Sequence, residues 1–217
     1  MSRRRAAERH SGNAGAARVR RRALERRLVI LRAAGRAFRR HGFARTGMRE
    51  IAREAGLSPA NLYYYFRGKN HILAFCQDHA LDLMLESVRR ARARRESVVD
   101  RLETVIRAQV LCMLDDLAGA AAHLEIDALP PATRGRIIRK RDRYERAVRG
   151  LIEEGTRGGF LVAQDPALAA RAILGAVNWS ARWYDPEGER TPMEIADLFS
   201  TYLVRGLKRR LNGGTRR

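Results

Sequence analysis

The spacing of apolar residues along the chain predicts helices almost throughout. From residue 24 to residue 41, apolar side chains recur every three or four positions and therefore lie on one helical face. The same spacing predicts further helices, the clearest of which cover 48–55, 59–66, 98–117, 166–183 and 192–207. No segment shows the strict alternation typical of a half-buried strand. The pattern therefore predicts an all-α protein with about nine helices.

Residues that start and stop helices divide these segments. Gly42 and Gly56 stand where a helix ends in a left-handed residue. Ser58 before Pro59 is a typical helix start, with a capping hydroxyl followed by proline in the first turn. Thr191–Glu194 has the spacing of a capping box.

The two ends of the chain lack an apolar period. Residues 1–22 mix arginine with small and polar residues, which predicts a disordered basic arm. Residues 212–217 form a short tail. Between them we expect a DNA-binding domain at 23–70 and a second helical domain, for ligand binding and dimerisation, at 71–211.

Charge is concentrated at the N-terminus. The 217 residues carry a net charge of +20, and residues 1–45 alone hold 15 Arg and 2 Glu, a net +13. Such a basic end indicates nucleic acid or an anionic membrane as partner. A membrane is disfavoured because the arm has no apolar face and no segment reaches the ~18–20 apolar residues of a span.

Little in the sequence indicates an enzyme, a metal or a cofactor. The P-loop, the nucleophile elbow and the zinc-protease helix motif are all missing from the sequence. Of the histidines, only His123 has acidic neighbours at a suggestive spacing, Glu125 and Asp127, and a helix end or pocket wall explains these residues better than a metal. Two isolated cysteines, Cys76 and Cys112, fit a reducing compartment. We therefore expect no cofactor and no metal, and a cytoplasmic protein associated with the nucleoid through DNA.

Two short helices joined by a tight turn, TGMREIAREAGLSPANLYYYF at 46–66, have the layout of a helix-turn-helix. The second helix of such a unit enters the major groove, where Asn61 can both donate to and accept from a base edge. Tyr63, Tyr64 and Tyr65 cannot all face one side of a helix, so at least one ring must point outward.

The segment resembles the DNA-binding domain of TetR-type transcriptional regulators. The matching residues, dense over 24–73, are Thr46, Arg49, Ile51-Ala52, Ala55-Gly56-Leu57-Ser58, Leu62-Tyr63, Tyr65-Phe66 and Lys69. The resemblance implies that Thr46, Arg49 and Ser58 lie on phosphates. It further implies that Ala60, Asn61 and Tyr64 face bases, and that Tyr63, Tyr65 and Lys69 hold the DNA backbone. Met48 and Gly47 complete the expected DNA-binding set, although Gly47 replaces the usual Ser or Thr and lacks a hydroxyl.

The C-terminal half resembles one branch of that family. The matching residues include Arg141-Asp142, Tyr144-Glu145, Asn178-Trp179 and Trp183-Tyr184. That branch regulates fatty-acid or sterol-side-chain breakdown and responds to acyl-CoA thioesters. The expected ligand-binding residues are Leu114, Leu117, Tyr144, Asn178, Trp179, Arg182 and Trp183. The two tryptophans fit either a cavity wall or a core or dimer contact, and Arg141 or Arg182 fits either a ligand phosphate or solvent.

Together these features predict a homodimeric regulator that binds a pseudo-palindromic operator in double-stranded DNA. We expect a repressor, because repression is the usual mode of the family that the sequence resembles. The dimer contacts are expected over 165–183 and 191–211, and the effector is a small hydrophobic molecule, a long-chain or sterol-derived acyl-CoA. Two alternatives stay open: a drug-like or other lipophilic effector, and an architectural DNA-binding protein that relies on its basic arm.

Overall fold

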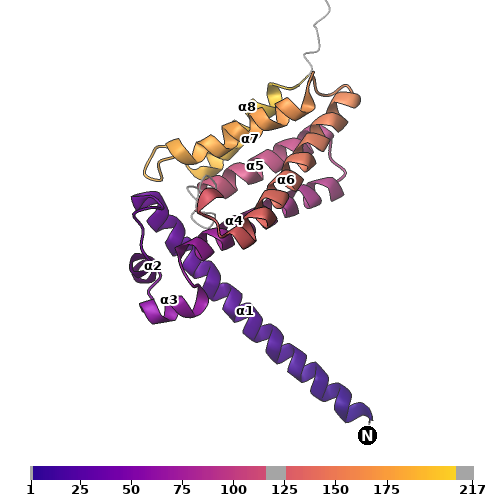
Figure 1. Cartoon of the computed structure of the whole chain (residues 1–217). Helices are drawn as coiled ribbons and strands as arrows, with labels where there is room; N and C mark the ends of the chain where they lie inside the picture. The colour runs from indigo at the N-terminus through magenta and orange to yellow at the C-terminus, as the bar shows by residue number, and fades with distance from the viewer. Residues whose placement is uncertain (1, 116–125, 209–217) are drawn as a thin grey trace, which may run out of the picture.

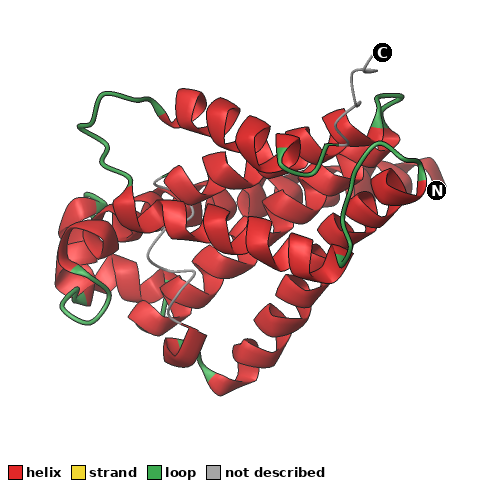
Figure 2. Cartoon of the chain, turned by 90° about the horizontal axis from the view of Figure 1, so that it is seen from above, coloured by secondary structure: helices red, strands yellow, loops and turns green. Residues whose placement is uncertain are grey.

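The computed structural model describes residues 2–115 and 126–208, and this part of the chain is almost entirely helical (Figures 1 and 2). Its α-helices are α1 (Ser2–His41), α2 (Met48–Glu54), α3 (Pro59–Tyr65), α4 (Lys69–Ala93), α5 (Val98–Leu114), α6 (Pro131–Arg157), α7 (Pro166–Trp183) and α8 (Pro192–Arg205). A single 3-10 turn covers Ile126–Ala128. The all-α prediction is confirmed, with eight α-helices in the described residues where about nine were expected.

The helices form a small head and a larger body (Figure 1). The second half of α1 contacts α2 and α4, α2 contacts α3, and these segments, with α4 as far as Phe75, make the head. The remaining length of α4 and helices α5–α8 make the body, in which α5 contacts all four of the other helices. α4 is therefore the helix that passes from one part into the other.

Helix α1 is longer than the sequence predicted. It begins at Ser2, whereas the sequence analysis expected a disordered arm over 1–22 and a helix from about Leu24. Arginine and alanine are good helix formers, and a helix already held at residues 24–41 extends backward without a new nucleation step. An exposed ion pair between Arg21 and Glu25, 2.9 Å apart, adds a little support. The first half of α1 projects away from the rest of the chain (Figure 1).

The expected helix starts and stops are present. The Ser58 hydroxyl accepts a hydrogen bond from the Asn61 amide at 3.2 Å and so caps α3. Thr191 and Glu194 form the reciprocal capping box of α8. Gly42 and Gly56 adopt positive φ angles of 77° and 63°, which turn the chain sharply after α1 and between α2 and α3.

An apolar core, an arginine–glutamate ion pair and a histidine–glutamate contact hold the head together. Ile51 of α2 and Leu62 of α3 are fully buried against Phe38 of α1. On the surface, Arg36 of α1 donates to Glu54 of α2 at 2.7 Å, and His41 lies 2.9 Å from Glu50. The core fixes the angle between α2 and α3, and the two contacts to glutamate fix α2 on α1.

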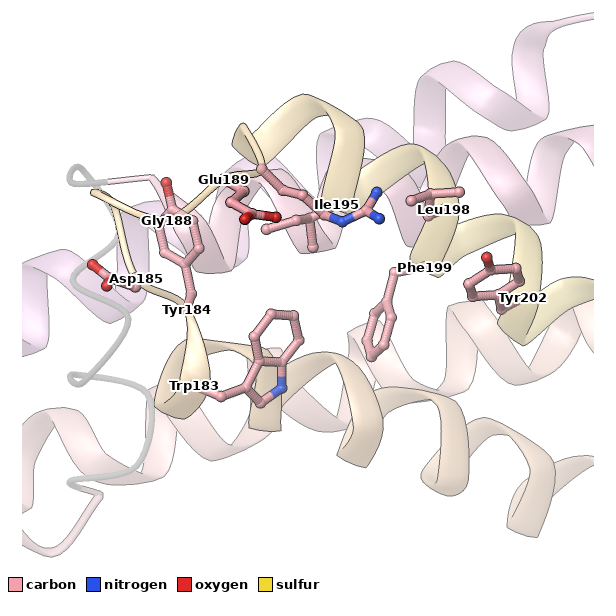
Figure 3. Close-up of a pocket in the computed structure, with 10 residues that line it drawn as sticks. Trp183, Tyr184, Asp185, Gly188, Glu189, Ile195, Leu198, Phe199 and Tyr202 are labelled. Atoms are coloured by element: carbon pink, nitrogen blue, oxygen red, sulfur yellow. The ribbon is translucent and has the colours of Figure 1, made fainter.

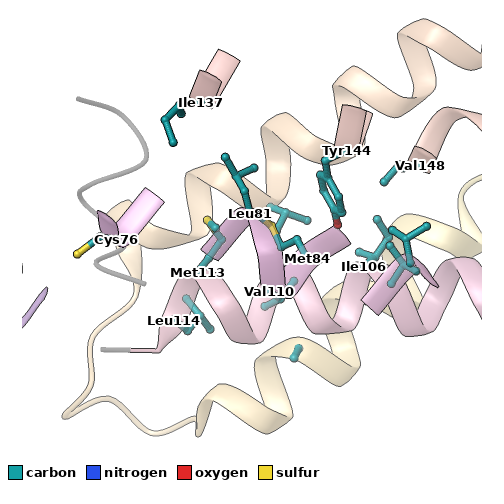
Figure 4. Close-up of a cluster of buried hydrophobic side chains, with 14 of the residues drawn as sticks. Cys76, Leu81, Met84, Ile106, Val110, Met113, Leu114, Ile137, Tyr144 and Val148 are labelled. Atoms are coloured by element: carbon teal, nitrogen blue, oxygen red, sulfur yellow. The ribbon is translucent and has the colours of Figure 1, made fainter. Parts of the chain in front are cut away.

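The body has a continuous apolar interior (Figure 4). The labelled side chains in Figure 4 come from α4, α5 and α6, and include Leu81, Ile106 and Tyr144. At its far end, Leu161 fits against Gly155, where even a methyl group would lie 2.5 Å from the leucine. The amide of Val162 then donates to the carbonyl of Leu207 at 2.7 Å, which fastens the end of α8 to the body.

Leu62→Ala should unfold the head more easily, because it leaves a cavity in a fully buried site. We expect a loss of about 2–5 kcal/mol in the free energy of unfolding, measured by urea denaturation. Tyr64→Ala is the matched control, because the Tyr64 side chain is exposed and its removal opens no cavity. Equal stabilities for both variants would contradict this assignment of the two faces of α3.

Glu54→Gln should weaken the head at neutral pH and not at acid pH. The hydrogen bond and charge of Arg36 hold the pKa of Glu54 below its ordinary value of 4.5. The ion pair therefore stabilises the folded state above pH 4.5, and this stabilisation is lost as the pH falls through the lowered pKa. Thermal melts should show a deficit of about 1 kcal/mol or less for the variant at pH 7, which shrinks as the pH falls below 4.5 through the lowered pKa. A deficit independent of pH would contradict the ion-pair explanation.

Candidate DNA-binding surface and ligand pocket

Helix α3 presents one face to solvent and the other to the head core. Leu62 is buried, whereas Ala60, Asn61, Tyr63 and Tyr64 are exposed, Tyr64 with 82% of its surface. The prediction that at least one tyrosine points outward is confirmed. An exposed helix face that carries an amide and phenol hydroxyls offers donors and acceptors for base edges and phosphates.

Tyr65 and Ser58 frame this surface. Tyr65 is half-buried, and its ring meets the edge of the Tyr64 ring with 5.1 Å between centroids. Tyr65 therefore fixes one side of the exposed ring. Ser58 is exposed, but its hydroxyl already accepts a hydrogen bond from the start of α3.

At the start of α2, Gly47 is the N-cap in an extended conformation and makes no side-chain cap. Arg49 is exposed and has no ion pair among the described contacts, so its guanidinium is available to a phosphate. Met48 is half-buried and packs on the core. The expected phosphate contact therefore fits Arg49, whereas Met48 contributes mainly packing.

Thr46 does not face DNA as the resemblance implied. Its surface is 1% exposed, and its hydroxyl donates to the carbonyl oxygens of Gly42 at 2.8 Å and Ala37 at 3.2 Å. A short hydroxyl side chain suits this position because it satisfies the carbonyl groups left at the end of α1. Thr46 therefore closes the loop between α1 and α2 and leaves no hydroxyl for a phosphate.

Lys69 also has a different role from the expected one. Its ammonium lies 2.9 Å from the carbonyl oxygens of Phe43 and Ala44 and 3.1 Å from that of Thr46, and 4.8 Å from the centre of the Phe43 ring. An ammonium has three protons, and these three carbonyls use them all. Lys69 therefore ties the loop before α2 to the first turn of α4, and its side chain is committed within the protein rather than to DNA.

A pocket of about 200 Å³ lies inside the body. Its walls come from α4, α5, α6 and α7, and three of their polar side chains are linked by hydrogen bonds. The Tyr144 hydroxyl donates to Gln109 at 3.0 Å, and the Gln109 amide donates to Asn178 at 3.1 Å. Arg141 of α6 donates to Gln77 of α4 at 2.9 Å. Fixed polar groups within apolar walls are what a small-molecule site requires.

Burial changes the titration of two pocket residues. It raises the pKa of the Tyr144 phenol, since the buried phenolate would lose its solvation. It lowers the pKa of the Arg141 guanidinium, which stays charged because its ordinary value is so high. The pocket therefore holds a neutral phenol and a cation at physiological pH.

The expected ligand-binding residues do not all line the same hollow in the structure. Tyr144 and Asn178 lie in the pocket together, joined through Gln109. Leu114 is buried and borders a different hollow, beside Tyr184 at the end of α7. Leu117 lies outside the described residues.

Three further expected ligand-binding residues do not line the pocket. Trp179, Arg182 and Trp183 are exposed along α7, Trp179 with 63% of its surface. These side chains point away from the interior because the opposite face of α7 is the one that packs into the body. None of the three lines the pocket that holds Tyr144 and Asn178, whereas Trp183 lines a groove between α7 and α8, so their contact with a ligand stays a prediction.

Gln77 and Gln109 are pocket-region residues that the sequence analysis missed. Each is almost fully buried within an otherwise apolar helical face. A single glutamine inside such a face is the signal that identifies them, because a buried amide needs partners that an apolar core does not supply.

A run of exposed apolar residues crosses α7 and α8, consisting of Leu168, Trp179, Trp183, Met193, Leu198 and Tyr202. Between the two helices a groove of about 530 Å³ opens (Figure 3). The rings of Trp183 and Phe199 meet there at 6.0 Å, and Tyr202 stands beside them. An apolar surface of this kind marks an interaction site.

Metal sites and membrane-spanning helices are both absent from the residues that the structure describes. In the parts of the chain that the structure describes, no group of three acidic, cysteine or histidine residues could hold a metal ion. His123 and Glu125 lie outside those parts. Among the described helices, none is long and apolar enough to cross a membrane.

Two family models match the chain. Residues 30–75 match the model described as "Bacterial regulatory proteins, tetR family". Residues 95–207, more than half of the chain, match "Tetracyclin repressor-like, C-terminal domain". The two matches cover the head and the body respectively.

Individual relatives match along most of their length. The HTH-type transcriptional repressor KstR2 of Rhodococcus jostii is 25% identical over 191 residues, which are 84% of this chain and 91% of the relative. The crystal structure of PfmR from Thermus thermophilus is 29% identical, with a TM-score of 0.72 and coverage of 83% and 99%. AibR, crystallised with isovaleryl coenzyme A and operator DNA, is 26% identical, with a TM-score of 0.68 and coverage of 82% and 98%.

The exposed face of α3, the head that carries it and the matches over both halves lead to one conclusion. The chain belongs to the TetR family and is a DNA-binding transcriptional regulator.

Proposed function

We propose that the chain acts as a homodimeric repressor that binds a pseudo-palindromic operator through α2 and α3 and leaves it when an acyl-CoA binds the body. The observation that carries this proposal is the outward face of α3, where Asn61 and Tyr64 stand exposed on a rigid head. Arg49 at the start of α2 supplies the adjoining phosphate contact.

The exposed apolar face of α7 and α8 supports dimerisation. It falls within 165–183 and 191–211, and two copies related by a two-fold axis would bury Trp179 and Tyr202 in a four-helix bundle. A dimer carries two heads, which must be about 34 Å apart to enter successive major grooves. The spacing of the heads therefore decides affinity for the operator.

The interior pocket and the relatives support an acyl-CoA effector. AibR was crystallised with isovaleryl coenzyme A, and the pocket of this chain combines apolar walls with fixed polar groups. A long-chain or sterol-derived acyl group is larger than about 200 Å³, so in this conformation only its end would enter. A drug-like or other lipophilic effector is the alternative.

Helix α4 supplies the connection between effector and DNA. Its Phe75 ring contacts Phe66 of the head at 5.6 Å, and its Leu81 and Met84 border the pocket. A ligand that displaces this part of α4 moves the head with it. Release then follows because the ligand binds the conformation with the wrong head spacing more tightly.

A second candidate function rests on the first half of α1. This projecting basic helix would suit an architectural protein that binds DNA mainly through phosphates. An architectural protein would need neither the interior pocket nor the exposed face of α3, so we favour the regulator.

Asn61→Ala and Tyr64→Ala should each reduce operator affinity by about 1–3 kcal/mol, because each removes a group facing base edges. Dimerisation and melting temperature should not change, since both side chains are exposed. Fluorescence anisotropy on operator and random DNA measures the effect. Equal losses on both DNAs would restrict the two residues to phosphate contacts.

Deleting residues 1–22 distinguishes the two candidate functions. A regulator should keep its site preference while its affinity and the slope of log K against log salt both decrease, since fewer counterions are released. An architectural protein should lose most of its binding. Anisotropy titrations between about 50 and 200 mM salt measure both quantities.

Acyl-CoA thioesters should release the protein from a labelled fragment of its own upstream region. Free CoA and the free acids should not release it, because free CoA lacks the acyl group and the free acids lack CoA. Anisotropy measured as each compound is added tests the proposal. Specific DNA binding that no thioester disrupts would support the regulator function and contradict the acyl-CoA effector.

A further inference from the structure

One carboxylate at the pocket has no partner. Glu145 of α6 lines it, and its buried Oε1 accepts no hydrogen bond in the part of the chain that the structure describes. Of the other polar side chains around it, Gln109 bonds with Tyr144 and Asn178, and Arg141 bonds with Gln77, whereas Asp142 is exposed to solvent. At this pocket, Oε1 of Glu145 is therefore a buried acceptor that the described part of the chain leaves without a donor.

An unused buried acceptor is unfavourable for folding, because it has lost water and gained nothing in return. In a chain with 44 basic residues and 24 acidic ones, a partner for a carboxylate would be easy to supply. Polar groups that break the rule of satisfied burial are concentrated at functional sites. The placement of Glu145 thus indicates a donor that arrives with a ligand.

The surroundings limit what that donor can be. An anion is disfavoured because Asp142 and Glu145 both line the pocket. A cation is disfavoured because Arg141 lies one turn before Glu145 on the same helix. Leu81 and Leu174 require a mainly apolar ligand surface. A neutral hydroxyl on a short hydrocarbon meets all of these conditions.

We propose that the pocket binds a hydroxylated, otherwise apolar group and that Glu145 accepts the hydrogen bond from its hydroxyl. The proposal rests on the ligand-sensing role of the body and names the chemical class of ligand, a hydroxyacyl group. A hydrogen bond to a charged acceptor should favour the hydroxylated compound over its unsubstituted counterpart by about tenfold or more.

Met84 gives a local readout, because it lines the pocket while the buried Met113 does not. Full-length protein with ¹³C-labelled methionine methyl groups would be titrated with hexanoyl, 3-hydroxyhexanoyl and 6-hydroxyhexanoyl thioesters. Each would be used both as the CoA thioester and as the N-acetylcysteamine thioester, which lacks the nucleotide. We expect at least one hydroxylated thioester to shift the Met84 signal at a tenth or less of the concentration that the hexanoyl thioester needs.

Glu145→Leu should abolish this preference, leaving the hydroxylated and plain thioesters within about threefold of each other. It should melt no lower than the wild type, because it removes a carboxylate without a partner. The matched control is Glu153→Leu, also on α6, where the carboxylate is half-exposed and lies 3.6 Å from Arg149. That variant should keep the preference.

The outcomes separate this inference from the proposed effector. Equal affinities for hydroxylated and plain thioesters, no Met84 shift with any compound, or a preference retained in Glu145→Leu would overturn the hydroxyl site. A melting temperature lowered by about 5 °C or more in that variant would show that Glu145 is structural and would overturn it as well. If the N-acetylcysteamine compounds show the preference and no CoA thioester releases operator DNA, the hydroxyl site stands and the acyl-CoA proposal fails.

Discussion

The arrangement of this molecule depends on α4, a single helix that packs in both the head and the body. On α4, the partly buried Phe75 contacts Phe66 of the head, and Met84, nine residues or about 14 Å further along the axis, lines the pocket. Lys69 binds the first turn of the same helix to the loop before α2. Because α4 is continuous through 25 residues, it provides the route by which the proposed effector would move the head.

Local sequence was enough to predict most of the fold, because helix periodicity and capping act over a few residues. Gly56, Ser58 and the Thr191–Glu194 box all took the roles expected of them. The exception was the first half of α1, where composition suggested disorder and the existing helix extended instead. A helix that projects from the protein needs no apolar face, so the spacing of apolar residues does not predict it.

The site was less predictable, because it depends on which groups the fold brings together. Helix geometry predicted that at least one tyrosine of α3 points outward, and Asn61 and Tyr64 are exposed, while their contact with bases stays a prediction. The roles of Thr46 and Lys69 were not predicted, since only the three-dimensional loop shows that their donors meet backbone carbonyls. The pocket joins residues that are distant in the sequence, such as Gln109 and Asn178, 69 positions apart, and no local pattern connects such a pair.

The two tryptophans of the chain both lie on the exposed side of α7, Trp179 with 63% and Trp183 with 47% of its surface accessible. The head contains no indole, and neither does the lining of the interior pocket. Intrinsic tryptophan emission therefore reports on a single face of the molecule. Its wavelength depends on how far α7 is covered, so in the proposed dimer it would report subunit association and be largely insensitive to events on α3.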